Sequence, residues 1–181
     1  MFDDKDIKIA GNRPSDSIKR NSLSATSADL LPEVQVEAAK KLGSYVADKF
    51  SEASNAYSDA VEDADVGMFV QRILLLSFTV TAVFETELLS DAVAGIAQKS
   101  FLDTVKKKYK DIYEYTSDTG AFTFYYLAYR RGSEVERRMG QTFAMLCSHD
   151  GDPIYQELGE VLFCWFSSVV KDAAIEFSLA K

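Results

Sequence analysis

The sequence predicts an all-α protein, a single helical bundle of five or six helices with an irregular N-terminal arm. From Pro32 onward, apolar residues recur every three or four positions, which is the period of a helix with one buried face. No stretch of useful length alternates between apolar and polar residues as a half-buried strand does. The chain has 181 residues, 47% of them hydrophobic and 27% charged, which suits one globular domain with a buried core.

Residues 1–31 differ in composition from the rest of the chain. They contain five Ser and one Thr, a Gly-Asn-Arg-Pro run at positions 11–14, and few apolar residues, which keep no sustained period. Such a segment buries too little apolar surface to fold by itself. We therefore expect residues 1–31 to form an N-terminal arm, flexible or docked on the surface, and residues 32–181 to form the helical bundle domain.

The first two helices are predicted over residues 32–63 and 66–97. Pro32 suits the first turn of a helix, and Asp65 suits the N-cap position of the second. Between Ile73 and Phe84 the second helix is apolar on every side, so we expect other helices to surround it. The apolar stripe of the first helix is Ala39, Leu42, Val46, Phe50, Ala53, Tyr57 and Val61.

A third helix is predicted over residues 100–118, and two more over residues 121–131 and 134–147. Gly132 suits the position that follows a helix end, and the Ser-x-x-Glu pattern from Ser133 fits a capping box for the next helix. The alternative is that these two helices are continuous, because one apolar stripe runs through both of them.

The last helix is predicted over residues 153–179. Asp152 suits its N-cap, and Pro153 suits its first position. Together with the second helix, we expect it to be the most central element of the bundle. Its apolar stripe is Ile154, Leu158, Leu162, Trp165, Val169, Ala173 and Phe177.

The charge is unevenly distributed along the chain. The whole sequence has 20 basic and 28 acidic residues, a net charge of -8, yet residues 99–138 hold nine basic and six acidic ones. The net negative charge disfavours nucleic-acid binding. Protein interfaces are enriched in Arg and Tyr, so a partner-binding surface is predicted here, with a solvated helix face as the alternative. Its candidate residues are Tyr125, Tyr126, Tyr129, Arg130, Arg131, Arg137 and Arg138.

Two carboxylates follow the apolar run of the second helix. Helical spacing continues its buried stripes through Glu85 and Glu87, so at least one of them is expected at the edge of the core. These two residues are the ligand-pocket candidates, as an anchor at the mouth of an apolar pocket. The alternatives are a helix that passes from buried to exposed, or a structural pair with Arg130 or Tyr113.

The scarcity of special residues excludes several chemistries. One His and two Cys cannot supply a di-iron centre with two Glu-x-x-His pairs or a His/Cys zinc site, and Cys-x-x-Cys is absent. The nucleophile-elbow, P-loop and dinucleotide-binding motifs are also absent. We therefore expect no metal, no cofactor and no catalytic residue. Cys147 and Cys164 both lie among apolar residues and are expected to be buried and reduced.

The sequence predicts a cytoplasmic protein without a membrane span. Its N-terminus lacks the apolar core of a secretory signal. The longest apolar run, Ile73 to Phe84, has twelve residues, whereas a membrane-spanning helix needs about twenty.

Two functional hypotheses remain, since no sequence motif indicates a particular activity. The first is a non-enzymatic protein-interaction or regulatory module that acts through the basic and aromatic surface or through a homo-oligomer interface. The second is a sensor-like bundle that binds a small apolar ligand in a pocket with a carboxylate at its mouth. An exposed aromatic patch favours the first hypothesis, and a connected apolar pocket favours the second.

Overall fold

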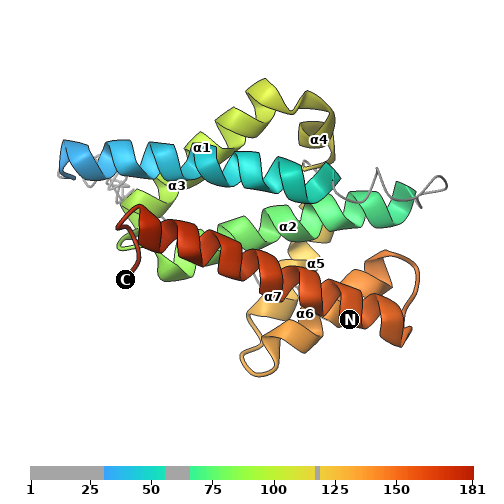
Figure 1. The fold of residues 1–181 in the computed structure, drawn as a ribbon. Coiled ribbons are helices and arrows are strands. Elements are labelled where there is room, and N and C mark those ends of the chain that lie inside the picture. Colours follow the sequence, from blue (N-terminus) through green and yellow to red (C-terminus); the bar gives the residue numbers. More distant parts are fainter. Residues whose placement is uncertain (1–30, 56–65, 117–118) are drawn as a thin grey trace, which may run out of the picture. The chain divides into compact units, whose positions relative to one another are not determined.

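The computed structural model describes residues 31–55, 66–116 and 119–181 (Figure 1). The all-α prediction is confirmed within these residues, where the helices are joined by turns and the β-type pairing is a single isolated bridge between Leu88 and Ala180. Seven helices lie in the described ranges: α1 Glu33–Asn55, α2 Val66–Glu87, α3 Asp91–Lys108, α4 Lys110–Tyr115, α5 Thr119–Tyr129, α6 Val135–Leu146 and α7 Pro153–Glu176.

Parts of the sequence predictions lie outside the described residues. These include the N-terminal arm up to residue 30, and Tyr57 and Val61 of the first predicted stripe. The five positions of that stripe from Ala39 to Ala53 are all buried, as predicted.

The second helix is shorter than predicted. It ends at Glu87, and α3 begins at Asp91, where one helix over residues 66–97 was expected. The Ser90 side chain accepts a hydrogen bond from the Val93 backbone N–H at 3.3 Å, which caps the new helix. A residue far along the chain also stabilises the break, because the Leu89 N–H donates a hydrogen bond to the Leu179 carbonyl oxygen at 2.9 Å.

The third predicted helix is divided in two. Tyr109, between α3 and α4, leaves the helical conformation with φ -128° and ψ 57°. Its hydroxyl donates a 2.8 Å hydrogen bond to Asp48 of α1. The break therefore coincides with a contact to another helix, which a local helical pattern does not reveal.

The predicted break between α5 and α6 is confirmed. Gly132 has a φ of +89°, a conformation that glycine adopts without strain. The predicted capping box at Ser133 does not form, because Glu134 is the N-cap residue and makes no side-chain cap bond. The predicted cap of α7 is present, since Asp152 accepts a 2.9 Å hydrogen bond from the Ile154 N–H and Pro153 follows it.

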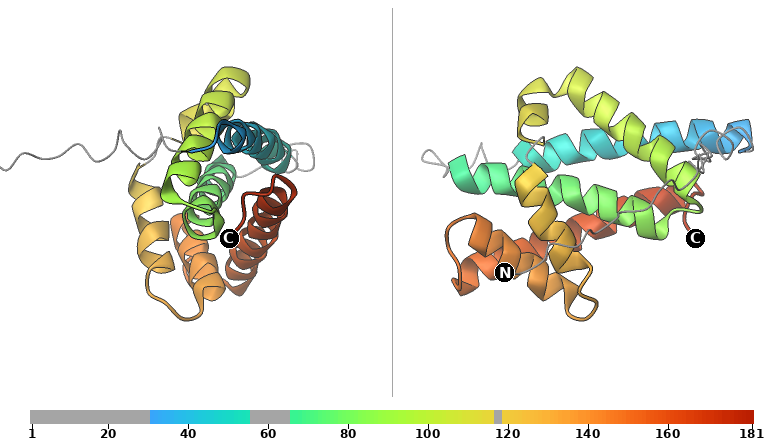
Figure 2. Two further views of the ribbon diagram at one scale, coloured as in Figure 1. Left: turned by 90° about the vertical axis from the view of Figure 1, so that its left-hand side faces the viewer. Right: turned by 180° about the vertical axis from the view of Figure 1, so that it is seen from behind.

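Helix α2 is the centre of the described bundle, as predicted. It packs against every other described helix, and the end view in Figure 2 shows it surrounded by the others. One of its faces, with Ile73 and Val80, joins a first core cluster with α1, α3 and α7. Another face, with Leu75 and Phe78, joins a second core cluster with α5, α6 and α7. The all-apolar character of α2 thus reflects burial on two faces.

Helix α2 is also the one described helix long and apolar enough to cross a membrane by length and composition. The stretch concerned is Gly67–Glu87, and 67% of its apolar window is buried inside the bundle.

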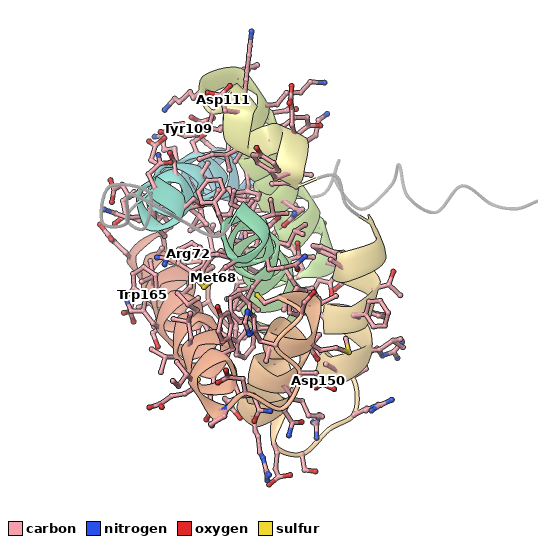
Figure 3. The ribbon with its side chains drawn as sticks, turned by 90° about the vertical axis from the view of Figure 1, so that its right-hand side faces the viewer. Met68, Arg72, Tyr109, Asp111, Asp150 and Trp165 are labelled. Atoms are coloured by element: carbon pink, nitrogen blue, oxygen red, sulfur yellow. The ribbon has the colours of Figure 1, made fainter. Side chains whose placement is uncertain are left out.

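The stripe predicted for the last helix is confirmed at Leu162 and Ala173 and wrong at Ile154 and Trp165, which are exposed. The buried residues of α7 include Leu162, Phe166 and Ala173, whereas Trp165 is 47% exposed. Figure 3 shows Trp165 at the outside of α7. The described helices that pack against α7, namely α1, α2 and α6, leave the side with Trp165 open.

Close helix contacts at glycine fix the position of α6 on α7. A Cβ atom on Gly140 of α6 would overlap the carbonyl oxygen of Gln156 in α7. A Cβ atom on Gly159 of α7 would lie 2.5 Å from the Cβ of Phe143 in α6. The two backbones therefore approach as closely as they do because neither position has a side chain.

A polar contact joins α1 to the turn between α3 and α4. Asp48 accepts hydrogen bonds from the Tyr109 hydroxyl at 2.8 Å and the Lys108 ammonium group at 3.0 Å. Burial alone would raise the pKa of Asp48, but these two hydrogen bonds outweigh it and hold the pKa below its ordinary value of 3.8.

We expect Asp48→Asn to destabilise the fold in a pH-dependent way. The folded pKa lies below the unfolded one, so the contribution of the ionised group is complete above the unfolded pKa and is lost as the pH falls through the folded pKa. The Asp48 side chain is 43% exposed, and solvent screening limits the loss to about 0.5–1 kcal/mol at neutral pH. Urea unfolding between about pH 7 and pH 2 measures it. A difference that stays constant over this range would contradict the prediction.

Candidate functional site

Helix α5 lies at the edge of the described bundle. It packs against α2 and α6, and in the end view of Figure 2 it occupies the outer side of the molecule. Its inner face, with Ala121, Tyr125 and Ala128, is buried in the second core cluster. The opposite face is open to solvent, although eight of the eleven residues in TGAFTFYYLAY are apolar or aromatic.

The open side of α5 carries large apolar side chains next to arginines. Phe124 is 50% exposed and Leu127 53% exposed, and Tyr126 is exposed beside them. The Arg130 guanidinium lies 5.4 Å from the centre of the Tyr126 ring and donates a 3.1 Å hydrogen bond to its hydroxyl. Arg131 is exposed at the same end. We call these five residues the α5 outer face.

The structure separates the seven partner-binding candidates into two groups. Tyr126, Arg130, Arg131 and Arg137 are exposed, and Arg137 lies 3.6 Å from the carboxylate of Glu134.

The other three candidates belong to the interior. Tyr125 is fully buried and cannot contact a partner. Tyr129 is half-buried, with its ring edge-on to Phe78 at 5.9 Å. Arg138 is half-buried and donates a 3.1 Å hydrogen bond to the Ala128 carbonyl oxygen, which ties α6 to the end of α5. Tyr125 and Tyr129 lie four positions apart on the side of α5 that packs in the second core cluster.

Phe124 and Leu127 were not among the sequence candidates. They lie three positions apart, as neighbours on a helix do, on the side opposite Tyr125. A short helix that is apolar on both sides does not reveal which side is covered, so the signal was present but ambiguous.

The basic residues of the middle of the chain form two separate groups. Lys106, Lys107 and Lys108 end α3, and Lys110 begins α4, at the top of the views in Figures 1 and 2. The connection between α5 and α6, which carries Arg130 and Arg131, lies at the bottom of the same views. The basic surface predicted over residues 99–138 is therefore divided, and the α5 group adjoins the exposed Phe124, Tyr126 and Leu127.

Tyr125 brings a polar atom into the core. Its hydroxyl is buried, and it has no hydrogen-bond partner among the described residues. Burial, with a smaller contribution from Cys147, raises the pKa of Tyr125 well above its usual value, so the hydroxyl stays neutral.

We expect Tyr125→Phe to leave the free energy of unfolding unchanged or to raise it by up to about 1 kcal/mol, because it removes an unpaired buried polar group. The matched control is Tyr109→Phe, which removes the bond to Asp48 and should cost about 1 kcal/mol. Urea denaturation of both variants measures the contrast. A loss above about 1 kcal/mol in Tyr125→Phe would show that this hydroxyl has a partner after all.

The two ligand-pocket candidates line two different surface depressions. Glu87 pairs with Lys171 of α7 at 2.9 Å, and not with the predicted Arg130 or Tyr113. The depression beside it has a volume of about 360 Å³ and lies between α2, the α5–α6 region and α7. Its walls are mixed, with the Tyr129 and Phe163 rings next to charged groups, and the Ser167 hydroxyl oxygen there is buried without a partner in the described chain.

Glu85 lines the second depression, of about 450 Å³, between α2 and α3. Gln98 forms part of its wall and donates a 3.1 Å hydrogen bond to the Thr81 hydroxyl. The Gln98 amide oxygen is buried and has no partner within the described ranges. Both depressions are open to solvent, and the described core between the helices is filled by side chains of the two clusters.

The cysteines and the histidine occupy different environments. Cys147 is buried as predicted, but Cys164 is exposed, because it lies on the open side of α7. Burial of its sulfur, together with Glu136 and Glu160, still raises the pKa of the Cys164 thiol. His149 stacks on Tyr155 with ring centres 3.8 Å apart. The described residues contain no group of three or more His, Cys, Asp or Glu side chains placed to hold a metal ion.

Comparison with known proteins does not indicate what these surfaces bind. The chain matches no family model, no curated protein and no solved structure.

Proposed function

We propose that this protein is an interaction module whose α5 outer face binds an acidic amphipathic helix of another protein. The observation that carries the proposal is the exposed pair Phe124 and Leu127 on an edge helix, next to Arg130 and Arg131.

The apolar part of the surface needs an explanation. Single exposed apolar residues are common on protein surfaces, but contiguous patches mark binding sites. Phe124 and Leu127, three positions apart, are neighbours on the open side of α5 and remain exposed, with Tyr126 exposed on its flank, while the other side is packed in the second core cluster. An amphipathic helix would cover them through residues spaced three and four apart.

The charges indicate the chemistry of the partner. Arg130 and Arg131 directly follow the C-terminal end of α5 beside these apolar residues, and the sequence of α5 contains no acidic residue. Arg is also among the residues that contribute most to binding energy. The chain has a net charge of -8, so much of its surface repels an acidic partner, whereas the arginines at this surface attract one. The same net charge disfavours nucleic acid as the partner.

Site-specific photo-crosslinking in the cells that produce the protein tests this proposal. Benzoylphenylalanine replaces Leu127 in one protein and Leu102 in the control, because Leu102 is an exposed leucine on α3. We expect position 127 to capture one partner segment that is acidic and amphipathic, and position 102 not to capture it. The double substitution Arg130→Glu and Arg131→Glu should abolish that crosslink. Equal capture at both positions, or a basic partner segment, would overturn the proposal.

The second candidate function is a ligand site beside Glu85. The buried, unpaired amide oxygen of Gln98 favours it, because a hydrogen-bond donor of a ligand would satisfy that atom. With Glu85 and Asp91 on the wall, the ligand would be a protonated amine with an apolar body.

Amide chemical shifts recorded with benzylamine, and with benzoate as the control of opposite charge, test this candidate. We expect benzylamine alone to shift Gly95 and Gln98, and Glu85→Gln to weaken the effect. Equal responses to both compounds, or no response to either, would reject it.

A further inference from the structure

The depression beside Glu87 combines an apolar interior with a charged rim. Residues of α2, α5, α6 and α7 line its volume of about 360 Å³, which is within the usual range of small-molecule sites. Ala82, Val83 and Phe163 of the lining are buried, whereas Lys171 is exposed and Glu87 half-buried. The apolar part of the lining is therefore less exposed to solvent than the charges.

The rim presents two opposite charges side by side. The Lys171 ammonium group lies 2.9 Å from the Glu87 carboxylate, and the two side chains remain 48% and 39% exposed. An ion pair as exposed as this one contributes little to stability. Both groups have hydrogen-bonding capacity beyond their mutual contact, so each can bind a further group of opposite charge.

One hydroxyl of the lining lacks a partner. The Thr86 hydroxyl donates to the Ala82 carbonyl oxygen at 2.9 Å. The Ser168 hydroxyl donates in the same way to the Cys164 carbonyl oxygen at 3.2 Å. Ser167 differs from both, because its hydroxyl oxygen is buried without a partner among the described residues. Since buried polar atoms are nearly always hydrogen-bonded, a ligand group beside Ser167 would complete the site.

We infer that this depression binds a free α-amino acid with an apolar side chain. The ammonium group of the ligand contacts Glu87, and its carboxylate contacts Lys171. The Ser167 hydroxyl, one helical turn before Lys171, donates to the same carboxylate. The apolar side chain packs on the rings of Tyr129 and Phe163, whose centres are 6.4 Å apart. Both charges of an α-amino acid are attached to one carbon atom, so they lie side by side as Glu87 and Lys171 do.

The charges of the rim select against ligands with a single charge. Lys171 repels a ligand that is only positive. Glu87 repels one that is only negative, and Glu136 of α6 adds a second carboxylate to the lining. The ends of a peptide are therefore disfavoured, because a first residue has no free carboxylate and a last residue has no free ammonium group. A charged ligand side chain is disfavoured by the cost of burying it in the apolar interior.

This site is separate from the two sites of the proposed function. It uses none of the residues of the α5 outer face, and Tyr129 belongs to the inner side of α5. The depression beside Glu85 has a different lining. Failure of the amino-acid site would therefore leave the proposed function standing, and the reverse also holds.

Amide chemical shifts recorded during titration with L-phenylalanine give the first test. The matched controls are L-phenylalaninamide, which lacks the carboxylate, and N-acetyl-L-phenylalanine, which lacks the ammonium group. We expect millimolar L-phenylalanine to shift the amides of Glu87, Ser167 and Lys171. Each control should bind at least about tenfold more weakly, because it loses a charged hydrogen bond. A control that binds as well as L-phenylalanine, or no shift with L-phenylalanine, would overturn the inference.

Substitutions in the lining give the second test. Lys171→Met should weaken L-phenylalanine binding by about tenfold and Ser167→Ala by about fivefold, both at an unchanged melting temperature. The matched control is Lys49→Met, which removes the lysine of another exposed ion pair, 2.9 Å from Glu52, and should bind as the wild type does. Wild-type affinity in Lys171→Met or Ser167→Ala, or an equal loss in Lys49→Met, would contradict the assignment of these residues to the site.

Discussion

Replacing Phe78 with alanine is expected to lower the free energy of unfolding by about 3–5 kcal/mol. Phe78 is 2% exposed, and its ring contacts three aromatic rings of α5. The ring centres lie 5.2 Å from Phe122, 5.8 Å from Tyr125 and 5.9 Å from Tyr129. The substitution leaves a cavity under α5. The second core cluster loses packing, and the helix that carries the α5 outer face loses its support.

The matched control is Phe50→Ala in the first core cluster. Phe50 is fully buried and contacts the rings of Phe101 and Phe166, so its loss should cost a similar 3–5 kcal/mol or so. Urea denaturation measures both losses. Hydrogen exchange distinguishes the two variants. Phe78→Ala, but not Phe50→Ala, should accelerate exchange of the α5 amides relative to the amides of the other described helices. Equal acceleration of α5 in both variants would contradict the packing described here.

Gly140→Ala is expected to destabilise the protein by about 1–3 kcal/mol. The new Cβ atom would overlap the backbone carbonyl oxygen of Gln156, which has no alternative rotamer to move into. The helices α6 and α7 must therefore separate. Because Arg138 of α6 holds the end of α5 through the Ala128 carbonyl oxygen, the shift should reach the α5 outer face as well.

Gly95→Ala is the matched control within a helix. Its Cβ atom would meet nothing within 4 Å, so the substitution adds no clash. Alanine in a helix interior is favoured over glycine by about 0.5–1 kcal/mol, and the variant should gain stability by that amount. Thermal unfolding compares the two variants. A gain of stability in Gly140→Ala as well would contradict a close contact between α6 and α7 at this position.

Much of the fold was predictable because it depends on local signals. The apolar stripe of α1, the all-apolar run of α2 and the turn at Gly132 each correspond to a burial or a backbone conformation in the structure. The breaks at Ser90 and Tyr109 were missed for a physical reason. They are supported by contacts with residues far along the chain, namely Leu179 and Asp48, which a local pattern does not contain.

The candidate site was predictable in part. Arg130 and Arg131 were identified from composition, and both are exposed. The tyrosines beside them could not be sorted by composition, because only the packing on α2 shows that Tyr125 is inside and Tyr126 outside. Trp165 was assigned to the core for a related reason, since α7 carries two apolar stripes and the sequence does not rank them.

Native mass spectrometry of the protein purified from its own cells tests the central claim most directly. We expect the wild-type protein to carry a second, different polypeptide, and a Phe124→Ala, Leu127→Ala variant of unchanged melting temperature to lack it. Both residues are exposed, so these substitutions remove contact surface without opening the core. A wild-type protein that carries only a small-molecule adduct, or a polypeptide that the variant retains, would contradict an interaction function for the α5 outer face.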